Sequence, residues 1–114
     1  MQQKNWETCI LDVENIRKLV EKEKYQFSKH AEQKREIHMI RIWELETALR
    51  NCEIIEDYPD DPRGPSCLVL GFCGARLVHI VCTIKEDIGE LLLITLYDPS
   101  GQSHKWTEDY RERR

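Results

Sequence analysis

Two apolar runs late in the chain, Arg76–Lys85 and Glu90–Tyr97, flank a short polar turn that ends in Gly89. Runs rich in β-branched residues around a glycine-containing turn are typical of an antiparallel β-hairpin. Both runs are apolar on both of their faces. We therefore expect this hairpin to lie at the centre of its sheet rather than at an edge.

The length of the hairpin loop decides which side chains face one another. A three-residue loop, 87–89, closed by a glycine in the left-handed conformation, would pair His79 with Tyr97. An imidazole and a phenol would then lie side by side on one face of the sheet, together with Thr95. We expect that face to be open to solvent near these residues.

Apolar residues spaced three and four apart predict helices in the first half of the chain. The first helix, over about residues 5–23, would bury one stripe of side chains against the sheet. That stripe comprises Trp6, Ile10, Val13, Ile16 and Val20. Ser28 can cap a second helix that runs from Lys29 to about residue 37 or 39. A third, short helix is expected over about residues 42–50.

An antiparallel meander of about four strands follows these helices. Its first two strands are expected at residues 53–58 and 67–73, separated by a proline-rich loop, and the hairpin supplies the other two. This order predicts a single α+β domain over residues 1–114. Two to three N-terminal helices would pack on one face of a roughly four-stranded antiparallel sheet, and the other face would be free.

The composition limits the classes of protein to consider. The five cysteines form no C-x-x-C pair of the kind that builds zinc sites, so we expect a reducing cytoplasm, no metal site and no cofactor. No signal peptide opens the chain, and no apolar run is long enough to span a bilayer. We therefore expect a cytoplasmic protein without membrane contact.

Positive charge is concentrated in two segments, although the net charge is −4. The candidate RNA-binding residues are His30 and Lys34 in the second helix, and Lys105, Arg111, Arg113 and Arg114 near the C-terminus. A local basic surface of this kind can hold phosphates even on an acidic protein. Ordinary solvated charges are the alternative explanation.

Several motifs occur in a recognisable order from about residue 10 to the end of the chain. They are Phe27-Ser28-Lys29-His30-Ala31, Gly74-Ala75-Arg76-Leu77-Val78-His79, Ile94-Thr95-Leu96-Tyr97-Asp98-Pro99, and Lys105-Trp106 with the closing arginines. In these motifs the chain resembles the small prokaryotic family labelled domain of unknown function 4258. That family is similar in predicted fold to the RelE-like toxins, which cleave messenger RNA and are usually encoded beside an antitoxin. The resemblance implies a RelE-like fold, an RNA substrate such as mRNA on the ribosome, and a cognate antitoxin as partner.

Metal-independent RNA cleavage needs a base, a cation near the phosphate and an acid for the leaving oxygen. The candidate catalytic residues are His79 for proton transfer, Arg76 to hold the phosphate, and Tyr97 to orient a proton or stack on a base. Strict strand alternation places Arg76 and His79 on opposite faces. Their joint action therefore requires Arg76 to lie in the turn before the strand.

Two functions stay open at this point. The first is an RNA endonuclease toxin of a toxin-antitoxin pair. The second is a catalytically inert module that binds a protein or a nucleic acid with the same sheet. Lys34 and His38 stand where the family usually has two arginines, and this difference, with the negative net charge, favours the second function.

Overall fold

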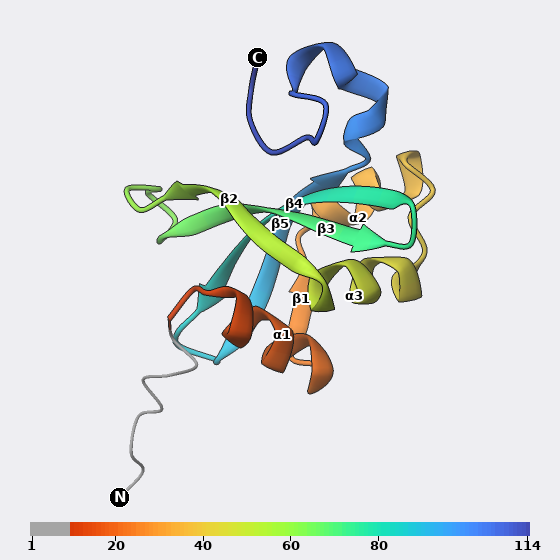
Figure 1. The fold of residues 1–114 in the computed structure, drawn as a ribbon. Helices are drawn as coiled ribbons and strands as arrows, with labels where there is room; N and C mark the ends of the chain where they lie inside the picture. Colours follow the sequence, from red (N-terminus) through yellow and green to blue (C-terminus); the bar gives the residue numbers. More distant parts are fainter. Residues whose placement is uncertain (1–9) are drawn as a thin grey trace, which may run out of the picture.

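The computed structural model of the chain describes residues 10–114 (Figure 1). The apolar sides of its helices and strands pack together in one core. The helices are α1 (Val13–Glu21), α2 (Lys29–Ile37), α3 (Ile42–Arg50) and the 3-10 segment η2 (Pro99–Lys105). The strands are β1 (Tyr25–Phe27), β2 (Cys52–Tyr58), β3 (Ser66–Cys73), β4 (Arg76–Lys85) and β5 (Glu90–Tyr97). The expected α+β class is confirmed.

One sheet contains all five strands in the order β1-β5-β4-β3-β2. Strands β2 to β5 form the expected antiparallel meander, and β1 pairs with β5 in parallel. The prediction that β4 and β5 lie inside the sheet is therefore confirmed. Strand β1 was not expected because a three-residue strand leaves almost no periodic signal.

The expected loop of the β4–β5 hairpin was wrong, although the pairing of His79 with Tyr97 is confirmed. Lys85 pairs with Glu90, so the loop covers residues 86–89 and is one residue longer than expected. The register then shifts at a β-bulge, because Val81 pairs with Thr95 and Cys82 with Leu93, which leaves Ile94 as the extra residue. The bulge cancels the effect of the longer loop.

Ser28 holds this bulge and starts α2 at the same time. Its hydroxyl donates to the Ile94 carbonyl (2.8 Å) and accepts from the Ala31 N–H (3.0 Å), as expected of an N-cap residue. The Ser28 N–H also donates to the Leu93 carbonyl (3.0 Å). The first turn of α2 is thereby fixed against the end of β5.

The first helix is shorter than the sequence predicted. It begins at Val13 because the Asp12 side chain accepts a hydrogen bond from the Asn15 N–H (2.7 Å) and caps the helix there. Ile16 and Val20 are buried in the core as expected. Ile10 lies before the cap and is 56% exposed, so its expected burial was wrong. Trp6 lies outside the described residues.

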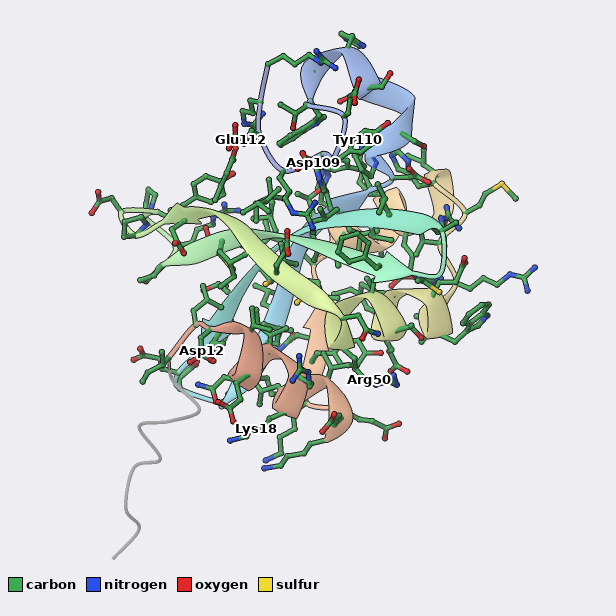
Figure 2. The ribbon with its side chains drawn as sticks, viewed as in Figure 1. Asp12, Lys18, Arg50, Asp109, Tyr110 and Glu112 are labelled. Atoms are coloured by element: carbon green, nitrogen blue, oxygen red, sulfur yellow. The ribbon has the colours of Figure 1, made fainter. Side chains whose placement is uncertain are left out.

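The two faces of the sheet are both covered. Helices α1, α2 and α3 contribute to the core on one face, and the C-terminal tail (residues 99–114), which includes η2, lies over the other (Figure 1). Figure 2 shows Asp109, Tyr110 and Glu112 of the tail on the opposite side of the sheet from Lys18 and Arg50. The expectation of a free second face was therefore wrong. No helix in the described part of the chain is long and apolar enough to cross a membrane.

Helix α3 approaches the sheet closely at one glycine. A Cβ atom placed on Gly71 of β3 would lie 2.5 Å from the backbone oxygen of Ala48 in α3. Only a residue without a side chain allows this approach. Gly71 therefore sets the distance between α3 and the sheet.

Candidate functional site

His79 lies on the tail-covered face and is completely buried, with 0% of its surface exposed. Its Nδ1 lies 3.2 Å from the Tyr97 hydroxyl and its Nε2 lies 3.0 Å from the Tyr110 carbonyl oxygen. The Trp106 ring packs edge-on against the imidazole, with 4.5 Å between ring centroids. The expectation that this face is open to solvent at His79 was wrong, because the tail covers it.

The hydrogen bonds determine which nitrogen of His79 carries the proton. A carbonyl oxygen can only accept, so Nε2–H donates to Tyr110, and Nδ1 accepts from the Tyr97 hydroxyl. Burial lowers the pKa of His79, outweighing the bond to Tyr110, which raises it. The neutral ring thus uses both nitrogens within the fold and has none left for a substrate.

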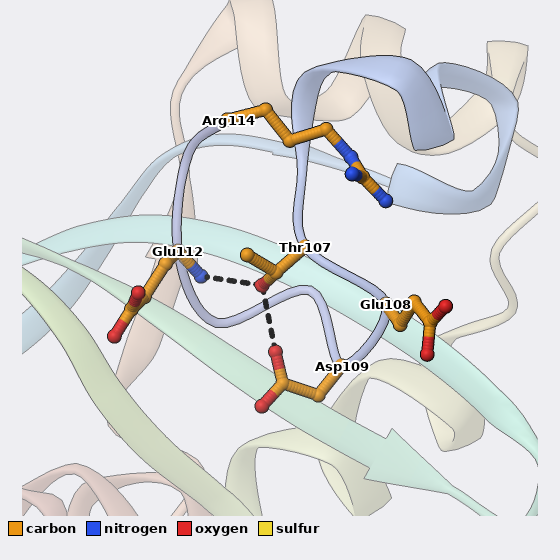
Figure 3. Close-up of a pocket in the computed structure, with 5 residues that line it drawn as sticks. All are labelled: Thr107, Glu108, Asp109, Glu112 and Arg114. Atoms are coloured by element: carbon orange, nitrogen blue, oxygen red, sulfur yellow. Dashed lines mark hydrogen bonds between the residues drawn. The ribbon is translucent and has the colours of Figure 1, made fainter.

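A small loop in the tail places the Tyr110 carbonyl oxygen 3.0 Å from His79 Nε2. Within this loop the Thr107 hydroxyl donates to Asp109 (2.7 Å) and accepts from the Glu112 N–H (3.2 Å) (Figure 3). Tyr110 itself adopts a positive φ of 61° at the turn of the loop. These bonds let a segment without regular structure reach back onto the sheet.

Arginines attach the tail to β2. Arg113 contacts Glu56 through Nε (2.9 Å) and lies over the Trp106 ring, 4.7 Å from its centroid. Arg111 pairs with Glu53, and the Arg114 side chain donates to the Trp106 carbonyl. Arg111 and Arg114, predicted to bind RNA, are thus engaged in holding the tail.

Arg76 lies on the opposite face from His79, as strand alternation requires, so its expected reach to the same site was wrong. Its guanidinium donates to the carbonyls of His38 (2.6 Å) and Met39 (3.1 Å). It also pairs with Glu44 (3.1 Å) and Asp98 (3.4 Å). Arg76 therefore joins the α2–α3 connection to the end of β5, and the three candidate catalytic residues do not converge.

A cavity of about 440 Å³ opens where α2, the end of β5 and the tail meet. We call it the α2–β5 cavity. Its functional lining residues are His30, Lys34 and His38 from α2 and its C-cap, Tyr97 from β5, and Lys105 and Arg113 from the tail. The structure thus brings together His30, Lys34, Tyr97, Lys105 and Arg113, which the sequence had marked as site residues.

Two of these cations are unpaired within residues 10–114. Lys34 and Lys105 form no ion pair with any described residue, whereas Arg113 is paired with Glu56. The carboxylate of Asp98, which also lines the cavity, is paired with Arg76. The α2–β5 cavity therefore presents uncompensated positive charge from two segments that are far apart in sequence.

His38 is a lining residue that we had not included among the candidate site residues. Its Nδ1 accepts a hydrogen bond from the Asp98 N–H (3.3 Å), so the neutral ring carries its proton on Nε2. Burial, with help from nearby Lys34, lowers its pKa. The spacing of His38 from Lys34, one helical turn, was the signal that could have included it.

Metal ligands are not assembled in this region. No group of three or more His, Cys, Asp or Glu side chains among the described residues is arranged to hold a metal ion. The α2–β5 cavity is lined by ammonium, guanidinium and imidazole groups, one phenol and the carboxylate of Asp98. Ammonium and guanidinium groups bind phosphate, and imidazoles can transfer protons.

Comparison with known families finds one match. A family model described as a domain of unknown function (DUF4258) matches residues 27–98, more than half of the chain, so the protein belongs to this family. The match includes α2 and β5 but ends before the tail, and is narrower than the resemblance drawn from the sequence motifs. No curated protein and no solved structure matches the chain significantly.

Proposed function

We propose that this member of the DUF4258 family is a binding module for single-stranded RNA, and that it holds the RNA backbone in the α2–β5 cavity. The observation that carries the proposal is the convergence of Lys34 and Lys105, both without an ion-pair partner in the described chain, on one cavity. Tyr97 lines the same cavity, and an aromatic ring beside cations is the usual combination for an unpaired base and its phosphate.

The number of free cations sets the expected salt dependence. Two phosphate contacts to single-stranded RNA give a slope of log K against log salt of about −1.4, since each contact contributes about −0.7. A slope of this small size is typical of weak, sequence-independent binding. It also agrees with the negative net charge of the chain, which opposes wide contact with a polyanion.

The test is fluorescence anisotropy with a labelled single-stranded RNA over a series of salt concentrations. We expect Lys34→Gln and Lys105→Gln each to weaken binding and to reduce the slope by about 0.7. Lys85→Gln is the matched control, because Lys85 is an exposed lysine at the hairpin loop, outside the cavity. Binding that is equally sensitive to all three substitutions would refute the assignment of the cavity.

Cleavage of the bound RNA is a second candidate function, and the two imidazoles in the cavity favour it. His30 is exposed and lines the α2–β5 cavity together with His38. Imidazoles can remove the proton from a 2′-hydroxyl as it attacks the adjacent phosphorus, and can protonate the departing 5′-oxygen. In this scheme the lysines stabilise the charge on the phosphate.

Incubation of end-labelled RNA with the protein in a metal chelator separates the two candidates. We expect any cleavage to be lost in His30→Ala or His38→Ala and kept in His104→Ala, which removes an exposed histidine of η2. Intact RNA under conditions of measured binding would leave the inert binding module as the function.

The resemblance to RelE-like toxins extends the cleavage candidate to a biological setting. In that setting the protein acts in the cytoplasm on mRNA, including mRNA on the ribosome, and an antitoxin inactivates it. Induction of the chain alone in a bacterial host should then stop growth, and the cavity variants His30→Ala and His38→Ala should relieve the arrest. Unimpaired growth with the wild-type chain would contradict this setting.

A further inference from the structure

Four large apolar side chains are exposed together at the connection between α2 and α3. Ile37 is 71% exposed, Met39 80%, Ile42 39% and Trp43 58%, and we call these four residues the α2–α3 patch. Soluble proteins expose single apolar side chains routinely, but a cluster of large ones marks an interaction surface. Nothing in the proposed RNA binding uses this patch.

The patch has both a projection and a hollow. A cavity of about 710 Å³ lies beside the exposed side chains and is lined in part by Met39, Arg41 and Trp43. A projecting side chain next to a hollow suits a two-fold contact, because each copy can then fill the hollow of the other. This shape favours a second copy of the chain as the occupant.

The backbone presents Met39 in an unusual way. The Ile40 N–H donates to the Arg35 carbonyl (3.0 Å) and the Met39 N–H donates to the Glu36 carbonyl (3.1 Å), which is the Schellman pattern for a helix end. Met39 occupies the left-handed position with a φ of 54°, where glycine is usual. A methionine there is strained, and its exposed side chain gains no burial in the isolated chain that would offset the strain, which favours a contact outside the fold.

The charges around the patch are self-complementary. Glu36 in the last turn of α2 and Arg41 just before α3 both line the hollow, and both are exposed. Neither forms an ion pair with another residue in the described range 10–114. In a contact with two-fold symmetry, Glu36 of one copy faces Arg41 of the other, and this happens twice.

We propose that the α2–α3 patch is the contact surface of a two-fold homodimer, in which apolar side chains fill facing hollows between two Glu36–Arg41 ion pairs. The four residues of the patch are far fewer than the roughly 20–30 residues that each partner contributes to a standard interface. The dimer is therefore weak, with a dissociation constant of about 10–100 µM. Arg76 supports the contact by fixing the carbonyls of His38 and Met39.

Sedimentation velocity over protein concentrations from about 1 to about 500 µM tests the proposal, because this range brackets the expected constant. We expect a concentration-dependent dimer in the wild type. Met39→Gly keeps the backbone conformation and removes the projecting side chain, so it should weaken the dimer at least about tenfold. Ile88→Glu is the control, because Ile88 is an exposed apolar residue of the hairpin loop, and it should leave the dimer unchanged.

Charge exchange makes the test specific for the two-fold arrangement. Glu36→Arg alone and Arg41→Glu alone should each be monomeric, since each places like charges opposite one another twice. An equal mixture of the two variants should dimerise again, because every contact then joins an arginine to a glutamate. Both positions are exposed, and a circular dichroism melt verifies that each variant folds.

A wild-type chain that stays monomeric throughout the concentration range would overturn the proposal and assign the patch to a different partner. A dimer that survives Met39→Gly, or a mixture of the charge variants that stays monomeric, would overturn it as well. RNA binding measured on Met39→Gly separates this result from the proposed function, because Met39 does not line the α2–β5 cavity and the substitution changes no charge.

Discussion

Replacement of His79 by alanine should destabilise the protein and release its C-terminal tail, including Lys105 of the α2–β5 cavity, while Lys34 stays in place in α2. His79 is buried and joins β5 to the tail through Tyr97 and Tyr110. If its role is to hold the fold together, His79→Ala will have a lower free energy of unfolding than the wild type. If its role is catalytic, the variant will have lower activity and the same stability as the wild type.

The contacts of His79 set the size of the effect. Two hydrogen bonds contribute about 1 kcal/mol each, and the edge-on contact with Trp106 contributes about another 1 kcal/mol. The truncated side chain also leaves a cavity and an unpaired carbonyl at Tyr110, so His79→Ala should cost about 3–4 kcal/mol in total. In a domain of this length each kcal/mol lowers the melting temperature by about 4 °C, which predicts a decrease of about 12–16 °C.

Urea unfolding and hydrogen exchange together measure this effect. His79→Phe keeps a ring against Trp106 and loses only the hydrogen bonds, so it should cost about 2 kcal/mol. The amide of Thr107, which donates to the Glu112 carbonyl (2.8 Å), should exchange faster in both variants because the tail loses its anchor. His104→Ala is the exposed control and should change neither measurement.

A His79→Ala protein with wild-type stability and unchanged exchange at Thr107 would refute this reasoning. It would show that the tail is held without the imidazole. A simultaneous loss of RNA cleavage would then return His79 to the list of catalytic candidates.

Three further predictions concern stability. Burial lowers the pKa values of His38 and His79, so below about pH 6.5 the unfolded chain takes up protons that the native chain does not. Urea unfolding at a series of pH values between about 7 and 5 should therefore show a free energy of unfolding that falls as the pH falls. His79→Phe should make that dependence shallower. Gly71→Ala should lower the free energy of unfolding, measured by chemical denaturation, by at least about 2 kcal/mol, because the new Cβ meets the Ala48 backbone. An unchanged free energy of unfolding would mean that α3 moves away freely. Arg76→Lys should lower the free energy of unfolding by about 2 kcal/mol, since one ammonium group cannot contact two carbonyls and two carboxylates together. A melting temperature equal to that of the wild type would contradict this.

Local patterns in the sequence predicted much of the fold. The bounds of α2 and α3 follow from periodicity and from the Ser28 cap, and the central hairpin follows from two apolar runs around a turn. Alternation also predicted that Arg76 and His79 lie on opposite faces. These features depend on residues close to one another in the chain.

The position of the C-terminal tail over the second face of the sheet could not be predicted in the same way. The tail has no periodic apolar pattern, and its position depends on bonds over long separations, such as Arg113 with Glu56 and His79 with the Tyr110 carbonyl. The α2–β5 cavity forms only when this tail brings Lys105 toward Lys34. Its residues could therefore be named from their chemistry, but not distinguished from Arg111 and Arg114, which hold the tail.

The bulge at Ile94 has a consequence for how this hairpin can vary in evolution. Compared with a three-residue loop and regular pairing, the loop 86–89 takes Glu86 out of β4 and the bulge takes Ile94 out of β5, so both arrangements place His79 opposite Tyr97. If only one of the two changed in a hairpin of the same length, His79 would pair with a residue next to Tyr97, whose side chain lies on the opposite face. Because residues 91–94 are all apolar, either face of that segment can enter the core, and such paired changes are tolerated. Loop length and bulge should therefore vary together among family members, as compensating changes.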